Sequence, residues 1–292
     1  MTQIHVSSQL PGPARLWRYM SLDKFVDLLS TQELFFTPLA SFADTDPYEG
    51  YLPKVALDAH ASINKNIVAQ TENAHKQLAE HLQKRGRTLS DEEKQTLKKQ
   101  LENLRSSLCR IMPAIAKTIM VNCWHVSEDE SEAMWRLYSE NGKAVAIETT
   151  LAALSQSIEI KESFRVVHIF PVKYLDFFDS NLKPSDCVVE GHLAPLLKRR
   201  SYQHEREVRA FIAKMAPDPR TAADVSFWKP ESVRVPIDLQ TLVKAVHISP
   251  YATAPFPSCV LKMCELFGLS KSRVQQSKLL DGHEELLERL RL

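Results

Sequence analysis

Apolar and polar positions alternate over several short stretches of the chain, as is typical of β-strands with one buried face. The first such stretch is 15–20, and an amphipathic helix follows it from Ser21, whose side chain is suited to capping a helix. Further strands are predicted at 33–37, 119–126, 143–149, 164–174, 207–213, 233–237, 244–249 and 272–278. Further helices are predicted at 130–140, 151–157, 188–200 and 256–267. Because these elements follow no regular βαβ order, the pattern predicts an α+β protein.

The pattern changes between about 54 and 118. Leucines recur there at helical spacings within charged, Gln-rich and Ala-rich sequence, and Arg85-Gly86-Arg87-Thr88 interrupts them. Ser90 and Glu93 have the spacing of a capping box, which marks the start of a second helix. We therefore expect a single domain over 1–292 that contains an inserted helical hairpin at about 54–118. Such a hairpin is suited to act as a lid or as a contact surface for a partner.

Composition then excludes several classes of function. With 44% hydrophobic and 25% charged residues, the 292-residue chain has the balance of a soluble globular protein. Its seven glycines are widely spread, and the closest two are Gly268 and Gly282. A dinucleotide-binding GxGxxG turn, a Walker A loop and a GxSxG nucleophile elbow are therefore absent. The 37 basic and 36 acidic residues nearly cancel, so bulk charge does not favour binding to nucleic acid.

Cysteine and histidine usage gives no sign of a metal site or of a disulfide framework. The five cysteines include no CxxC pair, and the ten histidines include no HExxH motif. Residues 1–16 lack the basic and apolar regions of a secretory signal, and no eighteen apolar residues are consecutive. We expect a reduced, cytoplasmic protein without a membrane-spanning segment and without a bound metal.

Two polar groups in the first fifty residues are candidates for chemistry. Arg18 and Tyr19 lie near the end of the first predicted strand, where alternation places Arg18 on the face opposite Trp17. A buried arginine needs an anionic or carbonyl partner, which is either a structural ion pair or a ligand. The second group, Asp44, Asp46 and Glu49, is suited either to binding a divalent metal or to shaping a turn.

Two further groups lie later in the chain. Trp135 and Tyr138 share a face of the helix predicted at 130–140, either as part of the core or as a surface for stacking on a planar ring. Glu205 and Glu207 are two apart at the entry to a strand and project to the same side. Within the segment 198–209 they form either a charged, solvent-facing edge or the mouth of a cleft, where nearby cations are ready for phosphates.

The order of several weak motifs resembles the bacterial family known as domain of unknown function 2971. The resemblance covers most of the chain outside the helical insertion. The motifs are Leu16-Trp-Arg-Tyr-Met-Ser-Leu, Glu33-Leu-Phe-Phe-Thr-Pro, Asp46-Pro-Tyr-Glu-Gly50, Cys123-Trp-His-Val-Ser, Met134-Trp135 with Tyr138, Gly142-Lys-Ala-Val-Ala-Ile, Tyr202-Gln-His-Glu-Arg-Glu-Val-Arg209 and Val243-Lys-Ala-Val-His-Ile-Ser-Pro250. The chain departs from the family pattern at Thr45, Trp124 and Val208, where the family has Asn, Phe and Tyr.

The same order of elements is more distantly similar to ADP-ribosyltransferases, and this is an analogy of fold. The analogy implies a split, mainly antiparallel sheet and an enzyme that consumes NAD. It would transfer ADP-ribose to an unknown protein, nucleic acid or small molecule, or hydrolyse NAD, in a toxin or phage-defence setting. The analogy implies Glu207, preceded by Glu205, as the catalytic carboxylate. The residues implied to bind NAD are Arg18, Tyr19, Ser21, Ser127, Trp135 and Tyr138.

Two other classes of function remain open from the sequence. One is a metal-dependent nuclease that uses Asp44, Asp46, Glu49 and Glu205, although no strand carries a Glu-x-Lys motif in a suitable place. The other is a non-catalytic module that binds a partner through the basic segment 198–209. Dependence of activity on a metal would favour the nuclease, and absence of any turnover would favour the binding module.

Overall fold

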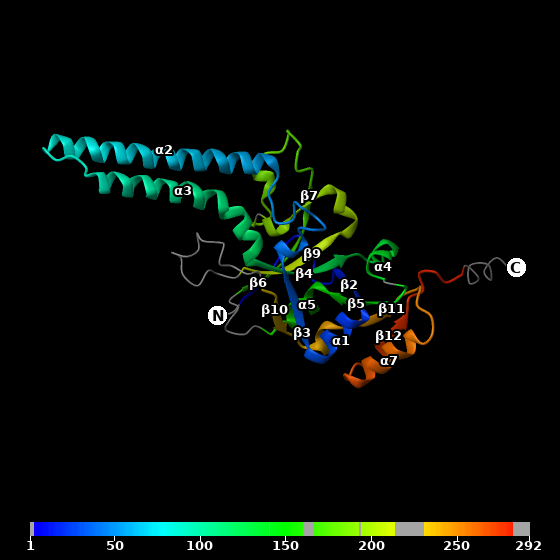
Figure 1. Ribbon diagram of the computed structural model, residues 1–292. Helices are drawn as coiled ribbons and strands as arrows, with labels where there is room; N and C mark the ends of the chain where they lie inside the picture. The colour runs from blue at the N-terminus through cyan, green and yellow to red at the C-terminus, as the bar shows by residue number, and fades with distance from the viewer. Residues whose placement is uncertain (1–2, 140, 160–165, 193, 214–230, 283–292) are drawn as a thin grey trace.

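The computed structural model describes residues 3–139, 141–159, 166–192, 194–213 and 231–282. These residues form a large sheet with helices packed on it and one long helical hairpin (Figure 1). The strands are β1 Gln3–Val6, β2 Arg15–Ser21, β3 Glu33–Pro38, β4 Ile119–Val126, β5 Ala144–Thr150, β6 Val166–Pro171, β7 Lys173–Leu175, β8 Leu197–Arg199, β9 Glu207–Ala213, β10 Val233–Pro236, β11 Ala245–Ile248 and β12 Val274–Gln276. The α-helices are α1 Leu22–Thr31, α2 Lys54–Lys84, α3 Asp91–Thr118, α4 Glu132–Tyr138, α5 Leu151–Ser157, α6 Leu239–Leu242 and α7 Phe256–Leu266.

Ten of the described strands form one sheet in the order β1-β6-β9-β4-β2-β5-β11-β12, and β3 pairs with both β4 and β10. All neighbours in this sheet are antiparallel except the outer pairs β1–β6 and β11–β12. The remaining strands, β7 and β8, form a separate parallel pair. The predicted α+β class with a mainly antiparallel sheet is confirmed.

Alternation along β2 determines which helices cover each face of the sheet. Leu16 and Met20 point into the largest core, where they pack with residues of α1, α5, α6 and α7. Trp17 and Tyr19 point to the other face and form a smaller core with Met134 and with the fully buried Trp135 of α4. Because successive strand residues face opposite sides, one short strand connects both cores.

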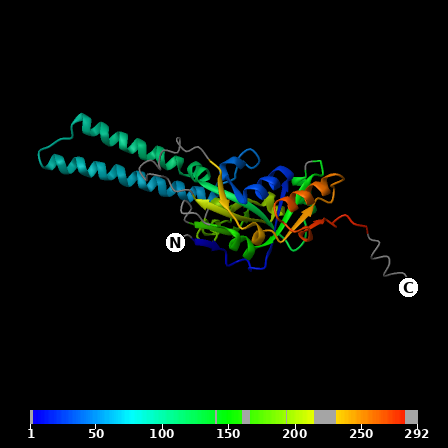
Figure 2. The ribbon, with the colours of Figure 1, turned by 90° about the horizontal axis from the view of Figure 1, so that it is seen from below.

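Helices α2 and α3 form the hairpin that the sequence predicts, and Figures 1 and 2 show it extending away from the sheet. With 31 residues, α2 is about 46 Å long at 1.5 Å per residue. The capping box expected at the start of α3 is present, since Ser90 accepts from the Glu93 amide and Glu93 accepts from the Ser90 amide. Contacts with the rest of the protein concentrate at the base, where Ala56 and Ala116 are buried.

The helix predicted at 188–200 is wrong. The described part of this segment contains an isolated bridge between Val189 and His192, a 3-10 turn over Ala194–Leu196 and strand β8. Glu190 and Gly191 both have positive φ angles, which end any helix, and Pro195 lacks the N–H that a helix interior requires. The sequence pattern also missed β1, an outer strand with largely exposed side chains.

Most other predicted elements are present within a few residues of the expected bounds. The stretch predicted as one strand at 164–174 is divided into β6 and β7, and its first two residues lie outside the described part of the chain. Within the described ranges, no helix combines the length and the apolar character needed to cross a membrane.

Candidate functional site

The candidate site lies where the sheet forks along β4. The end of β4 pairs with β2 through His125 and Val126, whereas its beginning pairs with β3 through Met120 and Val121. Between these pairs, the edge of β4 over 122–124 faces neither strand. A cavity of about 830 Å³ occupies this fork, a size within the range of small-molecule binding sites. We call it the fork cavity, and side chains of β2, β3, β4, α1 and β9 line it.

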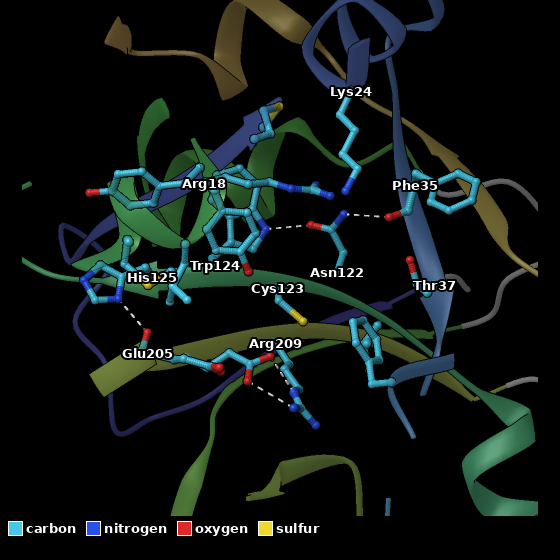
Figure 3. A pocket seen from close by; sticks show the side chains of 18 of the residues that line it. Arg18, Lys24, Phe35, Thr37, Asn122, Cys123, Trp124, His125, Glu205 and Arg209 are labelled. Atoms are coloured by element: carbon cyan, nitrogen blue, oxygen red, sulfur yellow. Dashed lines mark hydrogen bonds and ion pairs between the residues drawn. The ribbon is translucent and has the colours of Figure 1, made fainter. Parts of the chain in front are cut away.

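Asn122 stabilises the fork at its centre. Its Nδ2 donates to the Phe35 carbonyl of β3 at 2.9 Å, and its Oδ1 accepts from Nε1 of Trp124 at 2.8 Å (Figure 3). The Asn122 side chain is buried and cannot bond to water. These two bonds therefore pair its polar atoms, which would otherwise reduce the stability of the fold. Asn122 therefore links β4 to β3 across the opening of the fork and pairs the Phe35 carbonyl and the Trp124 indole N–H.

One side of the fork cavity carries two cations that form no ion pair with a described residue. Arg18 of β2 comes directly after the last residue that pairs with β4, and its guanidinium lies 5.7 Å from the ring centroid of Trp124. Lys24 extends from the first turn of α1, and Figure 3 shows its ammonium and the Arg18 guanidinium pointing to the same region beside Asn122. Neither cation has an ion pair or a hydrogen bond with a described residue.

The other side of the fork cavity carries a buried group of charges, which we call the ion-pair cluster. It consists of Glu49, Lys198, Glu205, Glu207 and Arg209. Figure 3 shows Glu205 and Arg209 on the other side of Cys123 from Arg18. With three carboxylates and two cations, the cluster has a formal charge of −1 when all its members are ionised. This side of the fork cavity is thus negative, whereas the opposite side carries Arg18 and Lys24 together with Arg234 and the carboxylates of Asp23, Asp27 and Glu33.

Arg209 is the centre of this cluster. Its Nη1 and Nη2 donate to the two carboxylate oxygens of Glu49 at 2.7 and 3.0 Å. Its Nε and Nη2 donate to the two oxygens of Glu207 at 2.7 and 3.0 Å, and Nη1 also donates to the Pro195 carbonyl at 2.8 Å. All three charged side chains are almost completely buried, so these paired bonds offset the cost of removing the charges from water.

Glu205 and Glu207 differ in how accessible their carboxylate oxygens are to a ligand. Glu207 is 6% exposed, and Arg209 and Lys198 contact its carboxylate oxygens. Glu205 is 22% exposed, and Lys198 binds only its Oε2, so that Oε1 has no hydrogen-bond partner among the described residues. Glu205 is therefore the carboxylate of this pair that can still accept hydrogen bonds from a bound molecule.

The two carboxyl groups also differ in pKa. Burial opposes ionisation of Glu207, but Arg209 and Lys198 outweigh it and lower the pKa to about 2. Burial raises the pKa of Glu205, and the single contact with Lys198 only partly compensates. Neighbouring carboxyl groups with diverging pKa values are typical of sites that divide chemical roles between two acids.

One further ion pair, a cation–π contact and a hydrogen bond attach the loop before α2 to the wall of the fork cavity. Arg199 binds Asp46 at 2.6 Å, and its guanidinium lies against the rings of Tyr48 and Tyr202. Tyr202 also donates to the Thr45 carbonyl at 2.9 Å. Lys198, Arg199 and Arg209 each form an ion pair with a carboxylate of the protein. The expectation that the cations of the segment 198–209 are available to phosphates is therefore wrong for these three.

Three groups that are neutral near pH 7 also line the fork cavity. Burial raises the pKa of the Cys123 thiol well above its usual value, and desolvation of its hydroxyl raises the pKa of Tyr138 to about 12, although 43% of this residue is exposed. Burial also lowers the pKa of His125, whose Nδ1 lies 2.5 Å from the Glu205 carbonyl and donates to it in the neutral ring. These three side chains therefore add no charge to the fork cavity near neutral pH.

The structure gathers five of the residues expected at the site from the sequence. Arg18, Tyr19, Tyr138, Glu205 and Glu207 all line the fork cavity. The Tyr19 hydroxyl accepts a 2.8 Å bond from the Ser131 amide, so its polar atom is already used within the protein.

The other three expected residues lie outside the lining of the fork cavity. Trp135 is completely buried, and its Nε1 donates to Glu130 at 2.9 Å. Ser127 accepts from the Asp129 amide, and Ser21 binds the carboxylate of Asp23. The expectation that Trp135 stacks on a ligand is not supported, because its ring is enclosed in the core beneath α4.

The carboxylates considered for a metal site are also engaged. Asp46, Glu49 and Glu205 each bind a cationic side chain, and Asp44 is exposed. Among the residues that the structure describes, no group of three or more His, Cys, Asp or Glu side chains is arranged to hold a metal ion.

Comparisons with protein families, with curated proteins and with solved structures found no match to this chain. The functional argument therefore depends on the geometry and charges of the fork cavity.

Proposed function

We propose that the protein consumes NAD, either transferring ADP-ribose to an acceptor or hydrolysing NAD. The observation that carries this proposal is the polarity of the fork cavity, which has Arg18 and Lys24 on one side and Glu205 on the other. NAD has a matching polarity, because its diphosphate is anionic and the positive charge of its nicotinamide ring passes to the ribose as the bond to nicotinamide breaks. The cavity volume of about 830 Å³ is also sufficient for a molecule of this class.

The reaction needs a carboxylate near the ribose. Loss of nicotinamide produces an oxocarbenium-like transition state, as glycoside hydrolysis does. A carboxylate fixed beside that centre stabilises the developing charge and accepts bonds from the ribose hydroxyls. Glu205 is suited to this contact because its Oε1 has no partner among the described residues, whereas Arg209 and Lys198 engage Glu207. We therefore assign the contact with the ribose to Glu205. We assign to Glu207 the role of holding Lys198 in place.

Two aromatic rings offer surfaces to the planar ends of the substrate. Tyr138 is 43% exposed and Phe35 is 39% exposed, although both line the fork cavity. Exposed aromatic faces of this kind gain from stacking on a nucleobase or on nicotinamide. The forked sheet adds support by analogy, since a split sheet is what the resemblance to ADP-ribosyltransferases implies.

The test is a product assay with purified protein and NAD, in the presence and absence of a cell lysate as a source of acceptors. Chromatography separates nicotinamide, ADP-ribose and unreacted NAD, and labelled NAD reports transfer to macromolecules. We expect nicotinamide release that the Glu205→Gln variant lacks. Absence of nicotinamide release under both conditions would contradict the proposed function.

A further inference from the structure

Arg18 and Lys24 are the two cations of the fork cavity that lack an anionic partner among the described residues. They come from different elements, β2 and α1, and Figure 3 shows their charged ends pointing to the same region. Two like charges that converge repel each other. Arg18 is partly buried and Lys24 is exposed, so an anion that enters from solvent can reach both and relieve the repulsion.

The carboxylates on α1 form hydrogen bonds with other groups and none with the Lys24 ammonium, although Lys24 acts on Asp23 through its charge. Asp23 accepts hydrogen bonds from the Ser21 hydroxyl and from backbone amides of the same turn. Asp27, one turn further along the helix, is held by both terminal nitrogens of Arg234 at 3.0 Å each. Both acidic neighbours of Lys24 on α1 are therefore bound elsewhere, and its ammonium extends into the cavity.

No carboxylate is among the groups that act most strongly on Arg18. The ionisable groups that act most on it are Cys123 and Tyr138, and both are protonated at neutral pH because burial raises their pKa values. Burial lowers the pKa of Arg18 itself, as expected of a cation whose desolvation is not compensated. The indole of Trp124 gives a cation–π contact at 5.7 Å, which leaves the N–H donors of Arg18 available.

A phosphate or diphosphate group fits this pair of side chains. The planar guanidinium of Arg18 can donate two parallel hydrogen bonds, and the ammonium of Lys24 supplies a point charge beside it. We propose that Arg18 and Lys24 form a phosphate-binding subsite of the fork cavity and that Lys24 selects phosphorylated nucleotides over nucleosides. The choice of a nucleotide rests on the proposed function, whereas the recognition of phosphate rests on these two side chains.

Calorimetry with ADP and adenosine tests the subsite without any turnover. Wild-type protein should bind ADP about 100-fold more tightly than adenosine, because adenosine forms neither charge-assisted contact. Lys24→Met should weaken ADP binding about tenfold and leave adenosine binding unchanged. Lys76→Met is the matched control, because Lys76 is an exposed lysine in the C-terminal half of α2 and does not line the fork cavity, and this variant should bind ADP as the wild type does.

Arg18 needs a variant that keeps the protein folded, since its side chain is partly buried. Arg18→Lys preserves the charge and should weaken ADP binding about tenfold through loss of the two-pronged contact, with an unchanged melting temperature. Equal affinities for ADP and adenosine, or full ADP affinity in Lys24→Met, would overturn the subsite. ADP binding that depends on Lys24 in a protein without NAD turnover would support the subsite and reject the proposed function. NAD turnover together with an ADP affinity that does not depend on Lys24 would support the proposed function and reject the subsite.

Discussion

Replacing Glu205 and Glu207 separately by glutamine distinguishes a contact with substrate from support of the site. Both changes conserve shape and remove one negative charge. Glu207 is bound through both oxygens within the ion-pair cluster, whereas Glu205 has one oxygen without a partner among the described residues. We expect Glu207→Gln to reduce stability and Glu205→Gln to reduce turnover.

The size of the Glu207 effect follows from its pKa and its burial. Lowering the pKa from its ordinary value of 4.5 to about 2 corresponds to about 3 kcal/mol of stability. Removing one partner of a buried ion pair costs about 3–5 kcal/mol, which agrees in order of magnitude. A loss of about 3 kcal/mol lowers the melting temperature of a protein of this size by roughly 6–12 °C. The wild-type stabilisation by Glu207 is present above about pH 4.5 and is lost as the pH falls toward 2.

Glu205→Gln should affect turnover instead. Its side chain is partly exposed and Lys198 retains contacts with Glu207 and Glu49, so we expect a stability change below about 1 kcal/mol. Loss of a carboxylate that stabilises the transition state lowers the rate about 100-fold or more, which is roughly 2.7 kcal/mol. Affinity for NAD should change much less than the rate, because the interaction strengthens in the transition state.

The assay compares nicotinamide release, NAD affinity and melting temperature across the two variants and a control. Glu102→Gln is suitable as the control, because Glu102 is an exposed glutamate on α3. Undiminished nicotinamide release by a well-folded Glu205→Gln protein would refute the assignment of this carboxylate. A Glu207→Gln protein with wild-type stability would refute the argument from buried ion pairs.

Three further predictions concern pH, the hairpin and metal ions. His247 is buried between Glu130 and Glu148 at 3.2 and 2.9 Å; burial lowers its pKa, but the two carboxylates more than offset this and raise it. The stabilisation by His247 should therefore be complete below about pH 6.5 and be lost as the pH rises through the higher pKa of this histidine in the folded protein. The free energy of unfolding of His247→Gln, measured with denaturant, should lack this pH dependence. Replacing 63–106 by a short linker should leave cooperative thermal unfolding intact, because most side chains in this range are exposed, and loss of a single transition would show that the hairpin is part of the core. NAD turnover should persist in excess EDTA, because the candidate metal ligands are bound to cations, whereas loss with EDTA and recovery with Mg²⁺ or Mn²⁺ would favour the nuclease.

Local patterns predicted much of the fold because they report burial directly. The alternation at 15–20 corresponds to β2, whose residues pack into cores on both faces, and the Ser90–Glu93 spacing corresponds to an observed capping box. The helix prediction for 188–200 was wrong because the spacing of the apolar residues in this segment is locally compatible with a helix. Its conformation depends on the turn at Gly191 and on the pairing of β8 with β7, which is a tertiary contact.

The candidate site was only partly predictable for the same reason. Glu205 and Arg18 were identifiable as polar residues on apolar strands, but nothing in the sequence indicates which charges pair. Glu49 and Arg209 are 160 positions apart in the chain and become partners only in the folded protein. Lys24 gave no signal, because an exposed lysine in the first turn of a helix is ordinary, and it becomes informative only once its acidic neighbours prove to be bound elsewhere.

The fork in the sheet explains how residues from opposite faces share one cavity. On a continuous sheet, Arg18 on the face of the main core and Glu207 on the other face would be separated by the backbone layer. Over 122–124, however, β4 lacks a neighbour on the side of β2 and β3, so this layer is open, and Asn122 pairs the Phe35 carbonyl at the opening. Closing the fork would remove the cavity and separate the cations from the carboxylates. The functional polarity of the site is therefore a consequence of how β2 and β3 diverge from β4.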